Sequence, residues 1–345
     1  MNSKERCLAA IHGLPVDRTP VFPLLMFFSA DRYGVPYREF ATNGHVLAES
    51  QLNIREMFAI DAITSCSDAF RISADLGGEM VYPEDKPPYL ARPLVGSEID
   101  LKRLRLPSPH QKGGRMLDRV QATAEMVRAV GEDCLVLGWV DMPFAEACSV
   151  CGVSQFMLMI VEEPDVAHQL LNFLTEVVIE FCLLQVDVGA PVIGAGDAAA
   201  SLISARMYRE FALPYEQRVC RAVHDRGGLV KLHICGRTGH LLQDMIHSGA
   251  DLFNIDHLVD FKVAKTVFDA DHKCYKGNLD PVADMLMSTP ASCEAKALDR
   301  IRMAQGSRYM LSAGCEIPAG VSDETFHTFC RAADRFAQTC EVPKP

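Results

Sequence analysis

The 345-residue sequence has no run of basic residues, no low-complexity segment and only one tryptophan. Lys and Arg together number 34, against 45 Asp and Glu, so the formal net charge is −11. Such a chain lacks the basic face that nucleic-acid binding requires, and we expect no nucleic-acid partner. The rest of the composition, 49% apolar and 23% charged, is that of an ordinary globular enzyme.

Long uninterrupted apolar segments are also missing. The polar start, Met1–Arg6, does not fit a secretory signal, and the most apolar stretch, Phe181–Ala205, contains Gln185, Asp187 and Asp197. We therefore expect neither export nor a membrane span. The thirteen cysteines are scattered along the chain, and we expect them to be reduced thiols in a cytoplasmic protein.

The chain shows no linker and no repeat, so we expect one domain over residues 1–345. Short β-rich apolar runs alternate with longer helical patterns, which predicts a parallel sheet with helical crossovers. The predicted strands are Val21–Phe27, Asp61–Cys66, Cys134–Trp139, Pro191–Ala195, Gly228–Ile234, Asp251–Ile255, Lys273–Lys276 and Tyr309–Ser312. These α/β units favour a (β/α)8 TIM barrel, with an open doubly wound sheet as the alternative.

Helical patterns separate most of the predicted strands. They are Lys4–Ile11, Met116–Val130, Phe144–Ile160, Asp165–Val188, Ala205–Arg226, Thr238–Ser248, Lys262–Phe268 and Asp323–Ala337. Ser322 is expected to cap the last helix, and Pro164 suits the first turn of the fourth. The Gly- and Pro-rich segment Phe70–Pro107 is interpreted as an insertion after the second strand, over one end of the barrel.

Three soft metal ligands stand at predicted strand ends. His233 and Cys235 are two residues apart, so they face the same side of a strand. Cys315 follows the eighth predicted strand, and strand ends converge at the mouth of a barrel. An imidazole and two thiolates with one open position are typical of a catalytic zinc site. On spacing alone, the alternative is two core thiols and a hydrogen-bonded core histidine.

A His-Cys-Cys donor set leaves zinc only weakly Lewis acidic. Such zinc is suited to holding a substrate thiol as its thiolate, which is the nucleophilic form. The pattern therefore indicates thiolate attack on an electrophile such as a methyl group. Asp197, after the predicted fourth strand, is a candidate catalytic carboxylate or a turn residue. Glu316 is a candidate fourth zinc ligand or a group that supports the ligands, and the favoured interpretation is a solvated loop carboxylate.

Further segments along the whole chain carry a family resemblance. They are Lys4–Ile11, Val16–Val21, Asp61–Ile63, Ser67–Ala69, Gly138–Val140, Pro143–Phe144, Leu202–Ser204, Phe211–Tyr215 and Gly277–Pro281. In these segments the chain resembles the uroporphyrinogen decarboxylase superfamily, which has the barrel fold. Asp68 matches a catalytic aspartate of the decarboxylase branch, so the resemblance implies a polar role in the pocket, against the alternative of a loop cap.

Two departures separate the chain from the decarboxylase itself. Leu25–Ala30 contains no arginine, where the decarboxylase has an arginine-bearing segment that holds porphyrinogen carboxylates. Cys315 stands in Gly-Cys-Glu, where the decarboxylase has Gly-His-Gly. Both changes make the chain similar to the methylcobamide:coenzyme M methyltransferases, whose zinc pattern His-X-Cys…Cys is matched by His233, Cys235 and Cys315.

This resemblance implies a zinc-dependent methyltransferase that moves a methyl group between a corrinoid (cobalamin) and a thiol or similar acceptor. Asp271 and His272 are adjacent and do not form the Asp-X-His-X-X-Gly signature of a corrinoid-binding domain, so we expect a separate corrinoid-binding protein to supply the methylcorrinoid. The alternatives are demethylation of a small methyl donor onto Co(I), a metal-independent decarboxylase, and a non-catalytic metal-binding partner of a corrinoid protein. The sequence is compatible with a homo-oligomer.

Overall fold

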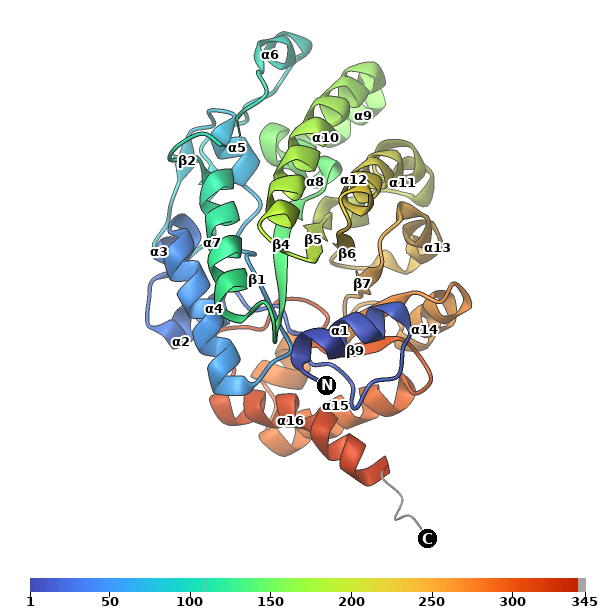
Figure 1. Ribbon diagram of the computed structural model, residues 1–345. Coiled ribbons are helices and arrows are strands. Elements are labelled where there is room, and N and C mark those ends of the chain that lie inside the picture. Colours follow the sequence, from blue (N-terminus) through green and yellow to red (C-terminus); the bar gives the residue numbers. More distant parts are fainter. Residues whose placement is uncertain (109, 341–345) are drawn as a thin grey trace.

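A parallel sheet forms the centre of the computed structural model, which describes residues 1–108 and 110–340 (Figure 1). The strand order, β1-β4-β5-β6-β7-β8-β9, follows the chain without a reversal, which excludes the doubly wound alternative. The strands are β1 Ala62–Thr64, β4 Leu135–Asp141, β5 Val192–Gly196, β6 Leu229–His233, β7 Leu252–Asn254, β8 Cys274–Leu279 and β9 Tyr309–Ala313. Seven of the eight predicted strands are therefore confirmed.

Residues 20–24 lie between β1 and β9, the two edge strands of this sheet. Val21 bridges Leu311 of β9 in parallel, and the Phe22 amide donates to the Leu311 carbonyl at 2.9 Å. On the other side, the Asp61 amide, just before β1, donates to the Val21 carbonyl at 2.9 Å. The sheet is thereby curled into a barrel-like α/β fold.

The predicted strand Val21–Phe27 is wrong as a regular strand. Its residues make only isolated bridges, at Val21 and Leu24, and helix α2 already begins at Phe27. Pro20 and Pro23 explain this, because proline has no backbone N–H to donate to a ladder.

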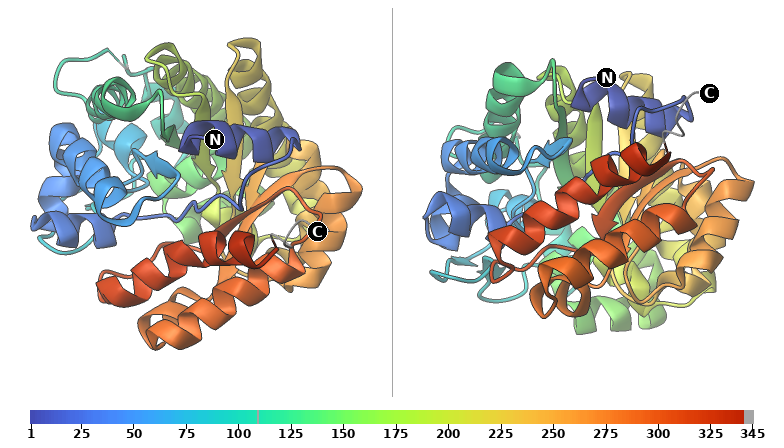
Figure 2. Two further views of the ribbon diagram at one scale, coloured as in Figure 1. Left: turned by 60° about the horizontal axis from the view of Figure 1, so that its bottom comes forward. Right: turned by 90° about the horizontal axis from the view of Figure 1, so that it is seen from below.

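Helices surround the sheet, and α15 and α16 lie side by side along one flank (Figure 2). The α-helices are α1 Ser3–His12, α2 Phe27–Tyr33, α3 Tyr37–Thr42, α4 Gly44–Phe58, α5 Arg71–Asp75, α6 Glu98–Arg103, α7 Arg115–Val130, α8 Pro143–Cys151, α9 Val153–Glu162, α10 Pro164–Asp187, α11 Ala205–Phe211, α12 Leu213–Asp225, α13 Leu242–Met245, α14 Phe261–Ala270, α15 Pro290–Met303 and α16 Asp323–Cys340. Short 3-10 or π segments are η1 Ala198–Leu202, η2 Thr238–His240, η3 Ile246–Ser248 and η4 Pro281–Leu286.

Most predicted helices are present, but three predicted as continuous are broken. Thr238–Ser248 consists of η2, the short α13 and η3. Phe144–Ile160 splits into α8 and α9 at Gly152, whose φ of 80° lies outside the helical region. Ala205–Arg226 splits into α11 and α12 at Ala212, before Pro214 in the first turn of α12. The expected cap of α16 is confirmed, since Ser322 Oγ accepts from the Thr325 amide, and Pro164 is in the first turn of α10.

The segment Phe70–Pro107, predicted as an insertion, lies between β1 and α7. It contains α5, α6 and a small antiparallel pair, β2 Met80–Val81 with β3 Tyr89–Leu90. That it is an insertion relative to related proteins stays a prediction.

The interior of the barrel changes from apolar to polar along its axis. Phe22, Leu137, Val192 and Met310 belong to a buried cluster that also contains Cys7, from α1, which packs against the strands at this end. Polar side chains follow toward the carboxyl ends of the strands: Lys231, His233, Asn254 and Lys276 are all buried. The polar end is therefore where a site can form.

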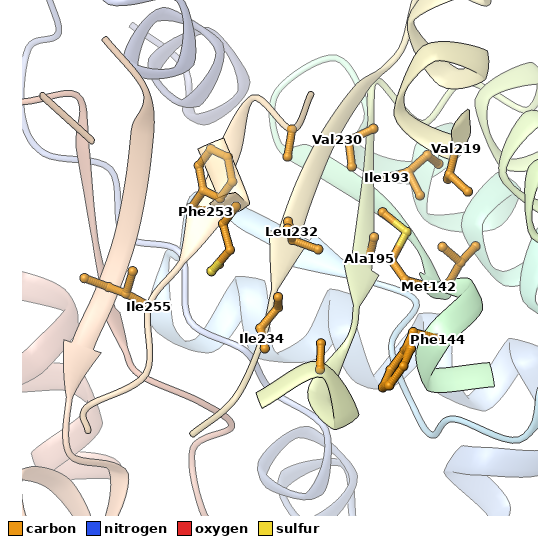
Figure 3. Packing of buried hydrophobic residues seen from close by; sticks show 14 of the residues in the cluster. Met142, Phe144, Ile193, Ala195, Val219, Val230, Leu232, Ile234, Phe253 and Ile255 are labelled. Atoms are coloured by element: carbon orange, nitrogen blue, oxygen red, sulfur yellow. The ribbon is translucent and has the colours of Figure 1, made fainter. Parts of the chain in front are cut away.

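The outer face of the sheet packs against the helices. Figure 3 shows Val230, Leu232 and Ile234 of β6 and its extension beside Ile193 and Phe253 of the neighbouring strands. Because side chains alternate along a strand, the residues between them, including His233, face the barrel interior.

By length and composition, α10 is the one helix of the described residues that is apolar enough to cross a membrane by itself. Half of its most apolar window is buried inside the fold, where it packs against α8, α12 and β4. The pair α8 and α9 passes the same test only when taken together, and these helices are bent by 109°.

Candidate metal centre

The structure brings His233, Cys235 and Cys315 together at the carboxyl end of the barrel. Cys235 Sγ lies 2.9 Å from His233 Nε2 and 3.6 Å from Cys315 Sγ, and Cys315 Sγ lies 3.7 Å from His233 Nε2. Ligands of a tetrahedral zinc are roughly 3.5 to 3.8 Å apart, given zinc bonds of 2.0 to 2.3 Å. Two of the three spacings fit this value, and the third is short by a fraction of an ångström.

The ring of His233 is oriented for this role. Its Nδ1 lies 3.3 Å from the backbone carbonyl oxygen of Asn254, at the end of the neighbouring strand β7. A carbonyl can only accept, so Nδ1 carries the hydrogen and Nε2 keeps a free lone pair toward the two sulfurs.

The cysteines of the cluster differ from the others that the structure describes. Among the twelve cysteines whose side chains the structure describes, all are free thiols; ten are buried, and Cys235 and Cys315 are partly exposed. The close approach of the two sulfurs favours one shared proton, which raises the pKa of Cys235 and lowers the pKa of Cys315. The imidazole and the two sulfurs, their spacing and their position at the open end of the barrel together fit a metal ion such as zinc.

A cation lies below the cluster. Lys231, two residues before His233 on the same face of β6, is fully buried, and its Nζ has no hydrogen-bond partner among the described residues. It lies 4.4 Å from the centre of the Trp139 ring. Burial lowers the pKa of Lys231 to about 8, while the sulfurs of Cys66, Cys235 and Cys315 act in the opposite direction.

Two carboxylates beside the cluster hold the backbone around it. Asp256, after β7, accepts from the amide of Gly236 at 2.9 Å and so fixes the turn that follows Cys235. Glu316 accepts from the amide of Phe27 at 2.6 Å, and burial raises its pKa to about 8. Glu316 is thus not the solvated loop carboxylate that the sequence favoured, because its oxygen ties the loop after β9 to the start of α2.

Asp68, a predicted catalytic residue, is engaged in a buried ion pair. Its carboxylate accepts from both Nη atoms of Arg115, at 2.9 and 2.8 Å, and from the Ser67 hydroxyl. Burial acts to raise its pKa, but Arg115 and Arg71 outweigh it and hold the pKa well below its ordinary value. Catalysis by Asp68 stays a prediction, and these contacts describe a structural carboxylate.

Asp197, the other predicted catalytic residue, donates a hydrogen bond from its backbone amide to the carbonyl of His233 at 2.8 Å, but its carboxyl group is directed toward Glu216 of α12. It is fully buried beside Glu216 of α12, and Glu216 also accepts from the hydroxyl of Tyr208. Burial and the neighbouring Glu216 raise the pKa of Asp197 well above its ordinary value. Its catalytic role likewise stays a prediction.

Sequence reasoning missed Asp141, the last residue of β4. In the register of three adjacent strands Asp141 pairs with Gly196, and Gly196 pairs with His233. Asp141 therefore faces the same interior as the cluster, with a glycine between them. The available signal was a charged residue that ends an apolar run, but the predicted strand stopped two residues earlier, at Trp139.

Comparison with known proteins agrees with this fold. The model of the uroporphyrinogen decarboxylase (URO-D) family matches residues 2–336. The chain belongs to this family. Its curated relatives include the uroporphyrinogen decarboxylase of Synechococcus sp. (strain CC9902), 29% identical over 94% of both chains, and that of Coxiella burnetii (strain Dugway 5J108-111), 27% identical over 98% of this chain and 97% of the other.

Among solved structures, a methyltransferase from Methanosarcina mazei superposes with a TM-score of 0.88 at 24% identity, covering 97% of this chain and 99% of its own. A B12-independent methionine synthase from Shewanella sp. W3-18-1 superposes with a TM-score of 0.58 at 10% identity, covering 93% and 96%. At these identities the two structures show a shared fold and no more.

Proposed function

We propose that this protein is a zinc-dependent methyltransferase that moves a methyl group from a methylcorrinoid to a thiol or similar acceptor. The observation that carries the proposal is the convergence of His233, Cys235 and Cys315, which are up to 82 residues apart in sequence, within 3.7 Å of one another. The curated relatives bear the decarboxylase name, but the M. mazei structure with the same fold bears the methyltransferase name.

His233, Cys235 and Cys315 would hold the zinc ion. When bound, zinc supplies one function, which is to lower the pKa of a substrate thiol so that it is present as thiolate at neutral pH. The chain keeps the ligands in place through the Asn254 carbonyl at His233 and through the Asp256 carboxylate at Gly236. The buried charge of Lys231 compensates part of the negative charge that thiolates bring to this end of the barrel.

In the overall reaction the sulfur of the acceptor takes the methyl group, and the thiol proton leaves to solvent. Both electrons of the carbon–cobalt bond stay with cobalt, which changes from Co(III) to Co(I). We propose that a separate corrinoid protein presents the methyl group at the barrel mouth. Exposed apolar side chains on the loops after β5, β7 and β8 (Leu202, Leu258, Val282 and Met287) provide contact area for such a partner.

Decarboxylation of a porphyrinogen is the second candidate, because the curated relatives carry that name. The structure offers little to hold a ligand with many carboxylates. Residues 25–30 contain no arginine, and Arg71 and Arg115 near the mouth are paired with Asp141 and Asp68. A decarboxylase without a metal would keep its activity after chelation, whereas the proposed methyltransferase would lose it.

The deciding experiment measures zinc per chain by elemental analysis in wild type, His233→Ala, Cys315→Ser and a control, Cys330→Ser in α16. We expect about one zinc per chain in wild type and in the control, and marked loss in the two ligand variants. Methyl transfer from methylcobalamin to added thiols should follow the zinc content. Full zinc content in both His233→Ala and Cys315→Ser would contradict the proposal.

A further inference from the structure

A cleft of about 340 Å³ opens beside the metal centre, between α8, the start of α9 and η1. Its volume is near the lower end of the range for small-molecule sites. Most of its wall is apolar, with Phe70, Ala145, Val153, Ala199 and Leu202 among the lining residues. The polar lining is limited to Asp141, Ser149 and Ser201, apart from the thiol of Cys148.

Two spatial relationships place this cleft near the metal ligands. Ser201 lines the cleft, and its Oγ lies 3.3 Å from the position that a Cβ of Gly236 would take, next to Cys235. Asp141 also lines the cleft, and it is in register with Gly196 and His233 across β4, β5 and β6. Adjacent strands are about 4.8 Å apart, so roughly 10 Å separates the backbones of Asp141 and His233.

Because residue 196 is a glycine, no side chain of β5 fills the space between Asp141 and His233. A Cβ there would lie 2.8 Å from Asp141 Oδ1, so the carboxylate extends over the glycine toward the metal centre. Its other oxygen, Oδ2, accepts from Arg71 at 2.9 Å, and no described residue donates a hydrogen bond to Oδ1. A molecule that spans the cleft and the metal centre would therefore pass beside a free carboxylate oxygen.

The residues that line the cleft include an acidic side chain and no basic one. No lysine or arginine is among its lining residues, and Arg71 is buried behind Asp141 with only 1% of its side chain exposed. Asp141 is the acidic residue of the lining. Of the buried carboxyl groups near it, Asp68 is paired with Arg115, and burial raises the pKa of Glu146 and Asp197 well above their ordinary values, so both are neutral. Arg71 donates to Oδ2 of Asp141, so Oδ1 is the carboxylate oxygen that a ligand in the cleft would meet, and it disfavours an anionic group there.

We propose that this cleft receives the body of the methyl acceptor and that Asp141 selects acceptors that carry a positive charge or a neutral hydrogen-bond donor rather than an anionic group. This inference rests on the proposed function, because it places the reacting sulfur at the His233–Cys235–Cys315 cluster. It adds the substrate class: an apolar-bodied thiol without carboxylate, sulfonate or phosphate. Asp141 is a specificity residue in this scheme, since it contacts the acceptor's distal group.

The test uses three thiols that share the HS–CH₂–CH₂– unit and differ in charge: cysteamine, 2-mercaptoethanol and 2-mercaptoethanesulfonate. Their dissociation constants for the zinc-loaded full chain are measured by calorimetry, which needs no turnover. We expect cysteamine to bind at least about tenfold tighter than the sulfonate, because like charges in a desolvated site repel. Asp141→Asn should remove most of this preference.

A second pair of variants keeps the test valid if Asp141→Asn folds poorly. Ser149→Lys places a cation in the lining of the cleft, and Ser154→Lys makes the same change at an exposed position of α9 outside it. We expect Ser149→Lys to shift the preference toward the sulfonate, and Ser154→Lys to leave the wild-type order unchanged.

The outcomes separate the two proposals. If the zinc-loaded protein binds the sulfonate tightest and neither Asp141→Asn nor Ser149→Lys changes the order, the cleft assignment is overturned while the methyltransferase proposal stands. If none of the three thiols binds the zinc-loaded protein, both are overturned.

Discussion

Arg115 holds both carboxylate oxygens of Asp68, with Nη1 2.9 Å from Oδ1 and Nη2 2.8 Å from Oδ2. The side chain of Asp68 is fully buried, and Arg115 is 11% exposed. Arg115 Nη2 also donates to the carbonyl of Ala41, so the pair joins α3, the loop after β1 and the start of α7. Asp68 is therefore placed to stabilise the fold, whatever part it takes in chemistry.

Replacing Asp68 by Asn should destabilise the protein by about 3 to 5 kcal/mol, because it leaves the charge of Arg115 buried without its partner. Urea unfolding measures the change. Asp323→Asn is the matched control: Asp323 pairs with Arg32 at 2.6 Å but is 51% exposed, so its loss should cost less than about 1 kcal/mol. Unchanged stability together with lost turnover would instead favour the catalytic role predicted for Asp68.

The buried carboxyl pair of Asp197 and Glu216 should make the free energy of unfolding fall as pH rises above about 4. Burial raises the pKa of Asp197, so the folded state keeps a proton that the unfolded state releases above about pH 3.9. Where the folded state binds more protons, stability decreases as pH rises. We expect Asp197→Asn to lose this dependence, so that its Tm approaches or exceeds that of wild type between pH 6 and pH 9.

Asp225→Asn, at the exposed end of α12, is the control for Asp197→Asn and should follow the wild-type pH profile. A parallel profile for Asp197→Asn and wild type would contradict the assignment. Methyl transfer should survive in Asp197→Asn, because the carboxyl group is directed toward Glu216 and not toward the sulfurs of the cluster. Lost turnover with unchanged stability would instead support the catalytic role predicted for Asp197.

Much of the site could be predicted from the sequence because its ligands are tied to strand ends. The apolar runs of β6 and β9 predicted that His233, Cys235 and Cys315 lie at strand ends. The alternation of side chains along a strand predicted that His233 and Cys235 face the same interior. Their meeting depends on the closure of the sheet, which a count of strand–helix units predicts without any coordinates.

The missed features depend on information that local patterns do not contain. Asp141 gains its importance from its register with Gly196 and His233, and register is a property of paired strands. Helix α4, Gly44–Phe58, was not predicted, although Asn43 caps it through the amides of His45 and Val46. The break at Gly152 was missed because a single glycine inside a helical pattern is often tolerated.

Zinc should stabilise the protein measurably, because the cluster links the ends of β6 and β9. A ligand that binds only the folded state at 100 times its dissociation constant contributes about 2.7 kcal/mol. We expect a chelator to lower the Tm of wild type and of Cys330→Ser, and to leave the Tm of Cys315→Ser unchanged. An equal effect of the chelator on all three would place the metal at other residues.

The two glycines of β5 should differ in their tolerance of alanine. A Cβ at Gly194 would lie 2.4 Å from Trp139 Cε3, in the packed interior below the cluster, where the ring cannot move aside. Gly194→Ala should therefore cost about 1 to 3 kcal/mol through overpacking. At Gly196 the neighbour is the carboxylate of Asp141, which borders the cleft and can rotate away. Gly196→Ala should thus be milder in urea unfolding, while weakening the preference for cysteamine.

The preference for a cationic thiol should depend on pH with a midpoint near 7. Burial raises the pKa of Asp141 to about 7, with Arg71 acting in the opposite direction, so the carboxylate is charged above that pH and neutral below it. As pH falls from 8 to 6, the ratio of cysteamine affinity to 2-mercaptoethanol affinity should therefore decrease toward one. Using the ratio matters, because protonation of the zinc ligands weakens the binding of both thiols alike. Calorimetry at each pH gives the ratio. In Asp141→Asn the ratio should not vary with pH. A wild-type ratio that stays constant over this range would mean that Asp141 does not contact the acceptor.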